Sequence, residues 1–516
     1  MRLTAIGWTA LAATLALAQP SPSSQHIFSF SSLPPTSWQP ISLSSIIELG
    51  GSLTRSQAVY TLQKDLKSHV KGDKWVVGVR QGGKEQGWVE AVEGKGGARR
   101  RVEMTAVGSD DTTTYYSIAL QPPHSSDKTT LTLSVVLPHS SHPHPATLPQ
   151  TADSIYMLWS GDLLAPLHGL TREQKARLEE VKVRVKTPTP RIVDVKKPEG
   201  FAVHQQQGSA TITFTSRGKV ADIGEQIATV HYQQPEAVAS IRKLDRIVEL
   251  SHWGANMAVQ DNLDLFNAGP SLEGQFARID YQKAMMHRRH GATALSALLI
   301  VLPPSTHNPY YYDLVGNVST SRFRSPATHS ALLPSQQKRS PAVLELQPRY
   351  PLMGGWNYSF TIGYDLPLGE FVRMRKGGKY VAAVPFLTPI RDVAVDDVRV
   401  EIRLPEGARD IHVHPPFPLS YLSLPSSTPL PLFSRLPTIK EGGNVAWTYL
   451  DSTGRPTVVM TKQGCTDRHG GEVYIEYTLP PAIDFFQKPL ACAAVLSSLF
   501  LVVIVTKRVT FGIADK

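Results

Sequence analysis

Proline is the feature that most limits how this chain can fold. Forty of its 516 residues are Pro. That is about 8 % of the chain, against about 5 % in an average protein. Because Pro lacks a backbone N–H and its ring clashes with the preceding helical turn, a proline-rich chain disfavours long helices. Hydrophobic residues make up 41 % of the chain and charged residues 19 %, which excludes wholesale disorder, a coiled coil and a polytopic membrane protein. We therefore expect a large, mainly β body.

Segments in which polar and apolar residues alternate support a β-rich fold. Such alternation sends successive side chains to opposite faces of a strand. Turn-forming residues such as Pro405-Glu406-Gly407 separate the segments. The clearest predicted strands are residues 74–80, 130–137, 181–185, 211–215, 358–364, 398–404 and 472–477.

Two segments allow helices. Thr171-Arg172-Glu173-Gln174 has the pattern of a capping box and predicts a short helix that ends near Glu180. The apolar run at residues 292–302 fits either a buried helix or a strand.

The two ends of the chain indicate entry into the secretory pathway. Residues 1–18 combine Arg2, an apolar stretch and small residues before Gln19, as in a cleaved signal peptide. Near the other end, residues 490–505 carry no charge and are followed by Lys507-Arg508. We expect one transmembrane helix at residues 485–506. The positive residues after it predict a cytosolic tail at residues 507–516 and a lumenal body of type I topology.

A domain boundary is expected near Pro235, after a strand at residues 225–232. The lumenal part then consists of two β-rich, sandwich-like domains, residues 19–235 and 236–484, each of a size that an all-β domain can reach. The chain has 2 cysteines, so a disulfide framework is excluded. Its net charge of +10 would suit a nucleic-acid partner, but a lumenal location argues against one.

Sequence motifs for catalysis are missing. The chain contains no HExxH, GxSxG, P-loop or GxGxxG motif. His287 with His290, and His412 with His414, have spacings that a metal could use, but no third ligand accompanies either pair. We interpret them as surface residues. The prediction is that the chain has no catalytic, metal-binding or cofactor-binding residues and needs no cofactor.

Charged clusters are interpreted as solvated surface. The closest acidic group, Asp392 with Asp396 and Asp397, is expected to be an exposed lead into the following strand. Basic clusters at residues 99–101 and 373–379 are also expected to be solvated, with contacts to lipid headgroups or a pyrophosphate as the alternative.

Two Asn-X-Ser sequons are present, Asn317-Val318-Ser319 and Asn357-Tyr358-Ser359. In a lumenal protein both Asn317 and Asn357 are candidate glycosylation sites. Asn317 follows Leu314-Val315-Gly316, which predicts an exposed turn.

Several strings resemble the ribophorin I family of oligosaccharyltransferase subunits, and they occur in the family's order. They are Tyr156-Met157-Leu158-Trp159-Ser160-Gly161-Asp162, Glu249-Leu250-Ser251-His252-Trp253-Gly254, Gly274-Gln275-Phe276-Ala277-Arg278-Ile279-Asp280-Tyr281-Gln282, Asp313-Leu314-Val315-Gly316-Asn317-Val318-Ser319, Gln347-Pro348-Arg349-Tyr350-Pro351-Leu352-Met353-Gly354-Gly355-Trp356 and Tyr449-Leu450-Asp451-Ser452-Thr453-Gly454-Arg455-Pro456. One departure is Ala255, which stands where the family usually has Asn.

The resemblance implies a fold and a role. The fold would be two lumenal β-rich domains, similar to the non-catalytic β domains of certain aminopeptidases, followed by one membrane span. The role would be a non-catalytic accessory subunit of oligosaccharyltransferase in the endoplasmic reticulum membrane. That complex transfers a preassembled glycan from dolichyl diphosphate to Asn in Asn-X-Ser/Thr of nascent polypeptides, and its active site belongs to a separate polytopic subunit. Implied partners are the other subunits and nascent polypeptides.

We interpret the residues shared with the family as structural. We expect Trp253 and Trp356 to bury large areas, Gly354-Gly355 to form a special turn, and Arg349 or Arg278 to bind a buried carboxylate or backbone group. Two other functions stay open: a stand-alone, membrane-tethered lumenal hydrolase, and a cargo-binding receptor.

Overall fold

The computed structural model confirms a mainly β protein with one long C-terminal helix. It describes residues 38–64, 74–80, 87–94, 99–109, 113–120, 128–167, 178–217, 227–286, 293–325, 341–424, 445–448, 451 and 454–508. Within these ranges strands dominate, and the last element is helix α5 (Pro481–Arg508). The expected signal peptide, residues 1–18, and the end of the expected tail lie outside the described residues.

The first body is built on an eight-stranded sheet. Its strands, in spatial order, are β14 (Ala202–Gln205), β15 (Thr211–Arg217), β12 (Glu180–Lys186), β1 (Trp38–Glu48), β2 (Leu53–Lys64), β8 (Lys128–Pro138), β4 (Trp88–Glu93) and β5 (Arg100–Val102). A four-stranded sheet contains β13 (Ile192–Lys196), β16 (Ile227–Gln234), β11 (Ile155–Asp162) and β9 (Ser141–Pro143). A three-stranded sheet contains β3 (Lys74–Arg80), β7 (Thr113–Ala119) and β6 (Met104–Ser109).

The second body is built on a nine-stranded sheet. Eight of its strands follow one path: β23 (Gly316–Asn317), β22 (His307–Asp313), β27 (Asn357–Pro367), β18 (Asn256–Asn267), β17 (Ala239–Ser251), β30 (Ala394–Arg403), β34 (Arg455–Cys465) and β32 (Tyr421–Ser423). The ninth, β33 (Val445–Ala446), pairs with β34. A four-stranded sheet contains β28 (Val372–Met374), β29 (Lys379–Pro385), β35 (Glu472–Thr478) and β31 (Arg409–His414).

Smaller elements complete the second body. They are the sheet of β21 (Leu298–Leu302), β25 (Ala342–Leu346) and β24 (Ser321–Arg324), the pair β20 (Ala294–Leu295) with β26 (Leu352–Met353), and helices α2 (Arg278–Met286) and α4 (Leu368–Phe371). A parallel pair, β10 (Thr147–Leu148) with β19 (Ser271–Leu272), joins a segment of the first body to one of the second.

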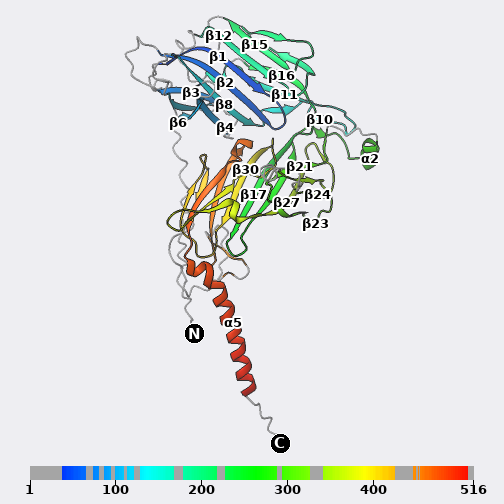
Figure 1. Ribbon diagram of the computed structural model, residues 1–516. Coiled ribbons are helices and arrows are strands. Elements are labelled where there is room, and N and C mark those ends of the chain that lie inside the picture. The colour runs from blue at the N-terminus through cyan, green and yellow to red at the C-terminus, as the bar shows by residue number, and fades with distance from the viewer. Residues whose placement is uncertain are drawn as a thin grey trace, which may run out of the picture.

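Each body has its own hydrophobic core. One large cluster of buried apolar side chains contains residues between Trp38 and Val238, and another contains residues between Ile241 and Tyr477. Burial of apolar area is the main stabilising contribution to each body, at about 25 cal/mol per Å². Figure 1 shows the bodies stacked end to end, with α5 leaving the second body at the end away from the first.

The predicted strands are confirmed within the described residues, apart from Leu404, which follows the last residue of β30. Of the predicted strand at residues 225–232, the described part, residues 227–232, lies in β16. The open segment at residues 292–302 contains strands β20 and β21. The predicted short helix that begins at residues 171–174 falls on residues 171–177, which lie outside the described residues; it does not extend to Glu180, which begins β12 and pairs in parallel with Ser42 of β1. Helix α2, whose first five residues (278–282) end one of the family-like strings, was not anticipated.

Candidate functional site

The nine-stranded sheet has one apolar and one polar face. In β18, buried residues such as Val259 and Leu263 alternate with partly exposed residues such as Gln260 and Asn262. The sheet register aligns the partly exposed positions of neighbouring strands, since residues directly opposite each other share a face. The resulting polar sheet face comprises Asp245, Glu249, Gln260, Asn262, Asp264, Tyr310, Tyr312, Ser359, Thr361, Asp365, Arg399, Glu401, Arg403, Thr457 and Thr461.

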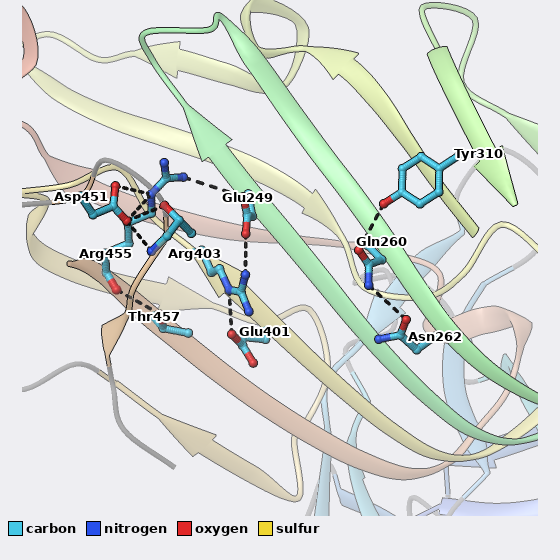
Figure 2. A network of polar contacts seen from close by, with 10 residues as sticks. Glu249, Gln260, Asn262, Tyr310, Glu401, Arg403, Asp451, Arg455 and Thr457 are labelled. Atoms are coloured by element: carbon cyan, nitrogen blue, oxygen red, sulfur yellow. Dashed lines mark hydrogen bonds and ion pairs between the residues drawn. The ribbon is translucent and has the colours of Figure 1, made fainter. Parts of the chain in front are cut away.

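Two arginines organise one half of the polar sheet face (Figure 2). Arg403 donates from Nη1 to Glu249 Oε1 at 2.5 Å and from Nε to Glu401 Oε1 at 2.8 Å. Arg455 Nη1 lies 3.9 Å from Glu249 Oε2, and its Nε lies 3.2 Å from Asp451 Oδ2. Burial works against the charge of Arg403, but Glu401 and Glu249 outweigh it and raise the pKa of this guanidinium. The acids of this half are therefore held as ion-paired carboxylates.

Amides and tyrosines form the other half of the polar sheet face, on the opposite side of Figure 2 from the two arginines. Tyr310 donates to Gln260 Oε1 at 3.1 Å, and Gln260 Nε2 donates to Asn262 Oδ1 at 3.1 Å. The Tyr310 and Tyr312 rings stack with centroids 6.1 Å apart and remain 43 % and 36 % exposed. Gly363 lies beneath the Tyr310 ring, where an added Cβ would come within 2.0 Å of Tyr310 Cζ. Glycine at this position is what lets the ring lie flat on the sheet.

A buried ion pair fixes the opposite face of the same strands. Arg246 donates from Nη1 to both oxygens of Asp261, at 3.1 and 3.0 Å, and from Nη2 to Tyr364 Oη at 3.1 Å. Both charged side chains are 0 % exposed. Burial raises the pKa of Asp261, and the charge of Arg246 opposes that shift. Removing either partner would leave a buried charge unpaired, so the pair fixes how β17, β18 and β27 align.

Another arginine–carboxylate pair holds the hairpin that carries the first sequon. Arg349 donates from Nε to Asp313 Oδ2 at 2.7 Å and from Nη2 to Asp313 Oδ1 at 2.9 Å. Asp313 also accepts the backbone N–H groups of Val315 and Gly316. The hydrogen bonds from Arg349 hold the pKa of Asp313 well below its ordinary value. The expectation that Arg349 binds a buried carboxylate is confirmed.

Both sequon asparagines are exposed in the structure. Asn317 ends β23 and Asn357 begins β27. The backbone oxygen of Asn357 accepts a hydrogen bond of 3.1 Å from Tyr350 Oη. Glycosylation of either residue stays a prediction.

The acidic cluster at the start of β30 was expected to be solvated: Asp392 (77 % exposed) and Asp397 are exposed as expected, whereas Asp396 is only 30 % exposed, and two of the three acids have partners in the first body. Asp392 Oδ1 lies 2.6 Å from Arg55 Nη2, and Asp396 Oδ1 lies 2.7 Å from His139 Nε2. Arg55 and His139 belong to the first body, so these carboxylates join the two bodies. Their partners are 337 and 257 residues away in the chain, a distance at which spacing in the sequence carries no signal.

The joint between the bodies also has an aromatic part. His469 lies edge-on to Trp88 of the first body and to Phe417 of the second, each with ring centroids 5.0 Å apart. His469 Nδ1 accepts the backbone N–H of Thr466 at 3.0 Å. Burial, with a smaller contribution from the charge of Lys462, lowers the pKa of His469 to about 3. The neutral ring is therefore the form that fits the joint.

The histidine pairs do not form an evident ligand set. His412 and His414 are exposed on β31, while His287 and His290 lie outside the described residues. Within the part of the chain that the structure describes, no group of three or more His, Cys, Asp or Glu residues could hold a metal ion. The arrangement that the structure does build is a broad polar sheet face able to make many hydrogen bonds to a polar ligand.

Comparison with known proteins assigns the family. The sequence model of the family described as Ribophorin I matches residues 38–507, which is most of the chain. The chain belongs to the ribophorin I family.

Curated relatives of this ribophorin I family member carry names of one kind. Dolichyl-diphosphooligosaccharide–protein glycosyltransferase subunit 1A of Arabidopsis thaliana is 30 % identical over 82 % of this chain and 62 % of its own length. Subunit 1B of Oryza sativa subsp. japonica is 30 % identical over 75 % of this chain and 71 % of the relative. Subunit 1 of Caenorhabditis elegans is 33 % identical over 55 % of this chain and 43 % of the relative. The chain thus spans about three fifths of the Arabidopsis relative's length.

Among solved structures, native leukotriene A4 hydrolase from Saccharomyces cerevisiae matches 44 % of this chain and 34 % of its own, at 9 % identity and a TM-score of 0.25. At that TM-score the likeness supports no conclusion about fold or function.

The residues shared with the ribophorin I family have differing roles in the structure. Gly355 adopts a φ of 82°, and a Cβ on Gly354 would come within 1.8 Å of the Pro270 oxygen, so the special turn is confirmed. Trp356 is partly buried against Phe276, with ring centroids 5.7 Å apart. The expected burial of Trp253 is wrong, because this side chain is 54 % exposed at the β17–β18 turn.

Proposed function

We propose that this chain is a non-catalytic accessory subunit of an oligosaccharyltransferase complex in the endoplasmic reticulum. The complex would transfer a preassembled glycan from dolichyl diphosphate to Asn in Asn-X-Ser/Thr of nascent polypeptides. The observation that carries the proposal is the family match over residues 38–507, together with relatives named as subunit 1 of a dolichyl-diphosphooligosaccharide–protein glycosyltransferase.

The engagement of the carboxylates supports an accessory role. Glycan transfer from a diphosphate needs oxygen ligands that can hold a divalent cation beside the leaving group. Asp392 and Asp396 instead pair with Arg55 and His139. Glu249 likewise pairs with Arg403. These acids serve the architecture of the bodies, and the catalytic site would belong to a separate polytopic subunit.

The helix α5 supports a single-pass arrangement. Its segment Pro489–Arg508 is long and apolar enough to cross a membrane. We propose that it does so with the body in the lumen, as the following Lys507 and Arg508 favour. The body would divide into two domains, residues 19–235 and 236–484, in keeping with the two cores.

The polar sheet face is the surface proposed to contact nascent polypeptides. An extended peptide exposes backbone N–H and C=O groups, which need hydrogen-bond partners on the protein. The partly exposed Gln260 and Asn262 offer such partners, and the stacked Tyr310 and Tyr312 offer apolar area beside them. The helix α5 would contact the other subunits of the complex.

A transfer assay tests the non-catalytic assignment. The purified full chain, given lipid-linked oligosaccharide, an acceptor peptide and Mn²⁺, is expected to form only background product. The variant Asp396→Ala/Asp397→Ala serves as the control and should give the same background. Metal-dependent turnover by the wild-type chain that this variant abolishes would contradict the proposal and make the chain the enzyme.

A further inference from the structure

One end of the second body lies beside the start of α5. Strand β35 reaches this end at Thr478, and α5 begins at Pro481. Lys379, the first residue of β29, pairs with Thr478 in the sheet register. The turn that joins β28 to β29, residues 375–378, therefore lies at the same end as the first turn of α5. Figure 1 shows α5 extending from there away from both bodies.

The β17–β18 turn is attached to this same end. His252 Nε2 lies 2.8 Å from Tyr477 Oη, one residue before Thr478. The His252 ring is also perpendicular to the ring of Tyr380, with centroids 4.7 Å apart. These contacts fix the turn beside α5, while the next side chain, Trp253, is 54 % exposed. Solvent exposure of a tryptophan at a fixed turn beside a membrane helix is informative, because Trp favours the membrane interface.

Exposed residues of the β28–β29 hairpin lie at the same end as Trp253, since the neighbouring His252 packs on Tyr380 of β29. We call the set the basic rim; its members are Trp253, Arg373, Met374, Arg375, Lys376 and Lys379. Met374 is 70 % exposed. Arg375 lies 2.9 Å from Glu476 but is itself 68 % exposed. The rim thus combines four cations with two large apolar side chains.

Acidic residues near the rim are engaged with other groups. Glu370 accepts a hydrogen bond of 2.7 Å from Ser305. Asp410 accepts one of 2.9 Å from Thr478. The hairpin from Val372 to Lys379 contains no acid of its own, so its charge is positive.

We propose that the basic rim docks on the anionic phospholipid headgroups of the membrane that α5 crosses. The proposal rests on α5 spanning that membrane. The first residue of α5 lies four residues before the predicted span start at residue 485 and eight before Pro489, where the apolar segment begins, so it is about 6 to 12 Å from the hydrocarbon core along the helix axis. A headgroup layer is about 5–7 Å thick, so the rim residues beside Pro481 lie at its outer edge, where long Arg and Lys side chains reach the phosphates. Cations bind the phosphates, and Trp253 with Met374 enters the interfacial zone.

The test places a fluorophore on the rim of the full chain in lipid nanodiscs. The label is attached to Met374→Cys in a Cys492→Ser background; Cys465 stays unlabelled because it is fully buried and burial raises the pKa of its thiol to about 12. The discs contain phosphatidylcholine with a headgroup-attached nitroxide quencher. One set also contains about 30 % phosphatidylserine, which makes the disc surface anionic. A matched label at Val315→Cys sits on the β22–β23 hairpin, is 79 % exposed at the native residue, and lies toward the opposite end of the sheet.

The expected result is at least twofold stronger quenching at residue 374 than at residue 315. It should increase with phosphatidylserine and weaken as salt is raised, because salt screens the attraction. Since each cation near an anionic surface strengthens attraction by about fivefold, Lys376→Glu/Lys379→Glu should reduce the quenching at residue 374 to the level at residue 315. The control Lys196→Glu/Lys197→Glu makes the same charge change on the first body and should leave it unaltered.

Three results would overturn the proposal. Equal quenching at residues 374 and 315 places the rim in solvent. If quenching at residue 374 changes neither with phosphatidylserine nor with Lys376→Glu/Lys379→Glu, anionic headgroups do not bind the basic rim. Failure of the labelled chain to co-elute with the discs shows that α5 does not insert, which removes the premise. The transfer assay above reads a different property, so the accessory assignment and the rim can fail separately.

Discussion

At the scale of single residues, His469 shows how the packing of one side chain sets a pH dependence. Its ring lies between Trp88 and Phe417, and its Nδ1 accepts the N–H of Thr466. The pKa of about 3 in the folded protein is below the value of about 6.5 in an unfolded chain. The unfolded state therefore binds the proton first, and stability is lost as the pH falls from about 6.5 toward 3.

Acidification from pH 7 to pH 5 should therefore lower the free energy of unfolding by about 2 kcal/mol through this histidine alone. The variant His469→Gln keeps an acceptor for Thr466 and does not titrate, so its loss over the same interval should be smaller. Denaturant unfolding of the full chain in detergent measures the difference. His204→Gln, at an exposed position of β14, is the control; a loss in His469→Gln as large as in this control contradicts the assignment.

Asn317 carries a prediction about modification. It is exposed at the end of β23, on a hairpin held by Asp313 and Arg349, so a glycan can extend from it without displacing the core. In secretory-pathway expression, Asn317→Gln should migrate faster on a gel by one glycan. Asn308→Gln, an exposed asparagine outside any sequon, should migrate as wild type. Identical mobility of all three proteins would show that the site is unused.

At the scale of elements, the β22–β23 hairpin depends on one distant arginine. Replacing Arg349 by Met removes both hydrogen bonds to Asp313, so Asp313 holds the amides of Val315 and Gly316 with less support. Amide hydrogen exchange at Val315 and Gly316 should become about tenfold faster, which corresponds to the free energy of one hydrogen bond to a charged group. Arg322→Met, an exposed position on β24, should leave the exchange unchanged. Equal exchange in the two variants would mean that Arg349 does not hold the hairpin.

Strands could be predicted from the sequence where a local residue pattern determines them. Alternation reports the two faces of a strand, so the strand at residues 74–80 was found in full. Prediction failed where distant residues decide. Glu180 is a strand residue because it pairs with β1, and Asp392 and Asp396 have their partners, Arg55 and His139, in the other body. Trp253 is apolar in sequence, but only the fold shows that its turn lies beside α5 with the ring exposed.

The site was likewise only partly predictable. Arg349 was identified as a residue for a carboxylate, while its partner Asp313 came from the structure. The polar sheet face was missed, although the alternating polar residues of Asn256–Asn267 carry part of its pattern. Its assembly from six strands depends on the sheet order, which local spacing does not contain.

At the scale of the whole molecule, two bodies and a helix are connected in a fixed order. The Arg55–Asp392 ion pair, the His139–Asp396 hydrogen bond and the packing of Trp88 on His469 join the first body to the second. The second body leads directly into α5. If α5 spans a membrane as proposed, this arrangement holds the polar sheet face at a set height above that membrane.

Native co-purification tests this account most directly. The full chain, tagged at its C-terminus and extracted from endoplasmic reticulum membranes in a mild detergent, should bring down a fixed set of membrane proteins that includes a polytopic subunit. The isolated assembly should transfer glycan from lipid-linked oligosaccharide to an acceptor peptide. Recovery of the chain alone, or with partners that have no transfer activity, would contradict its assignment as an oligosaccharyltransferase subunit.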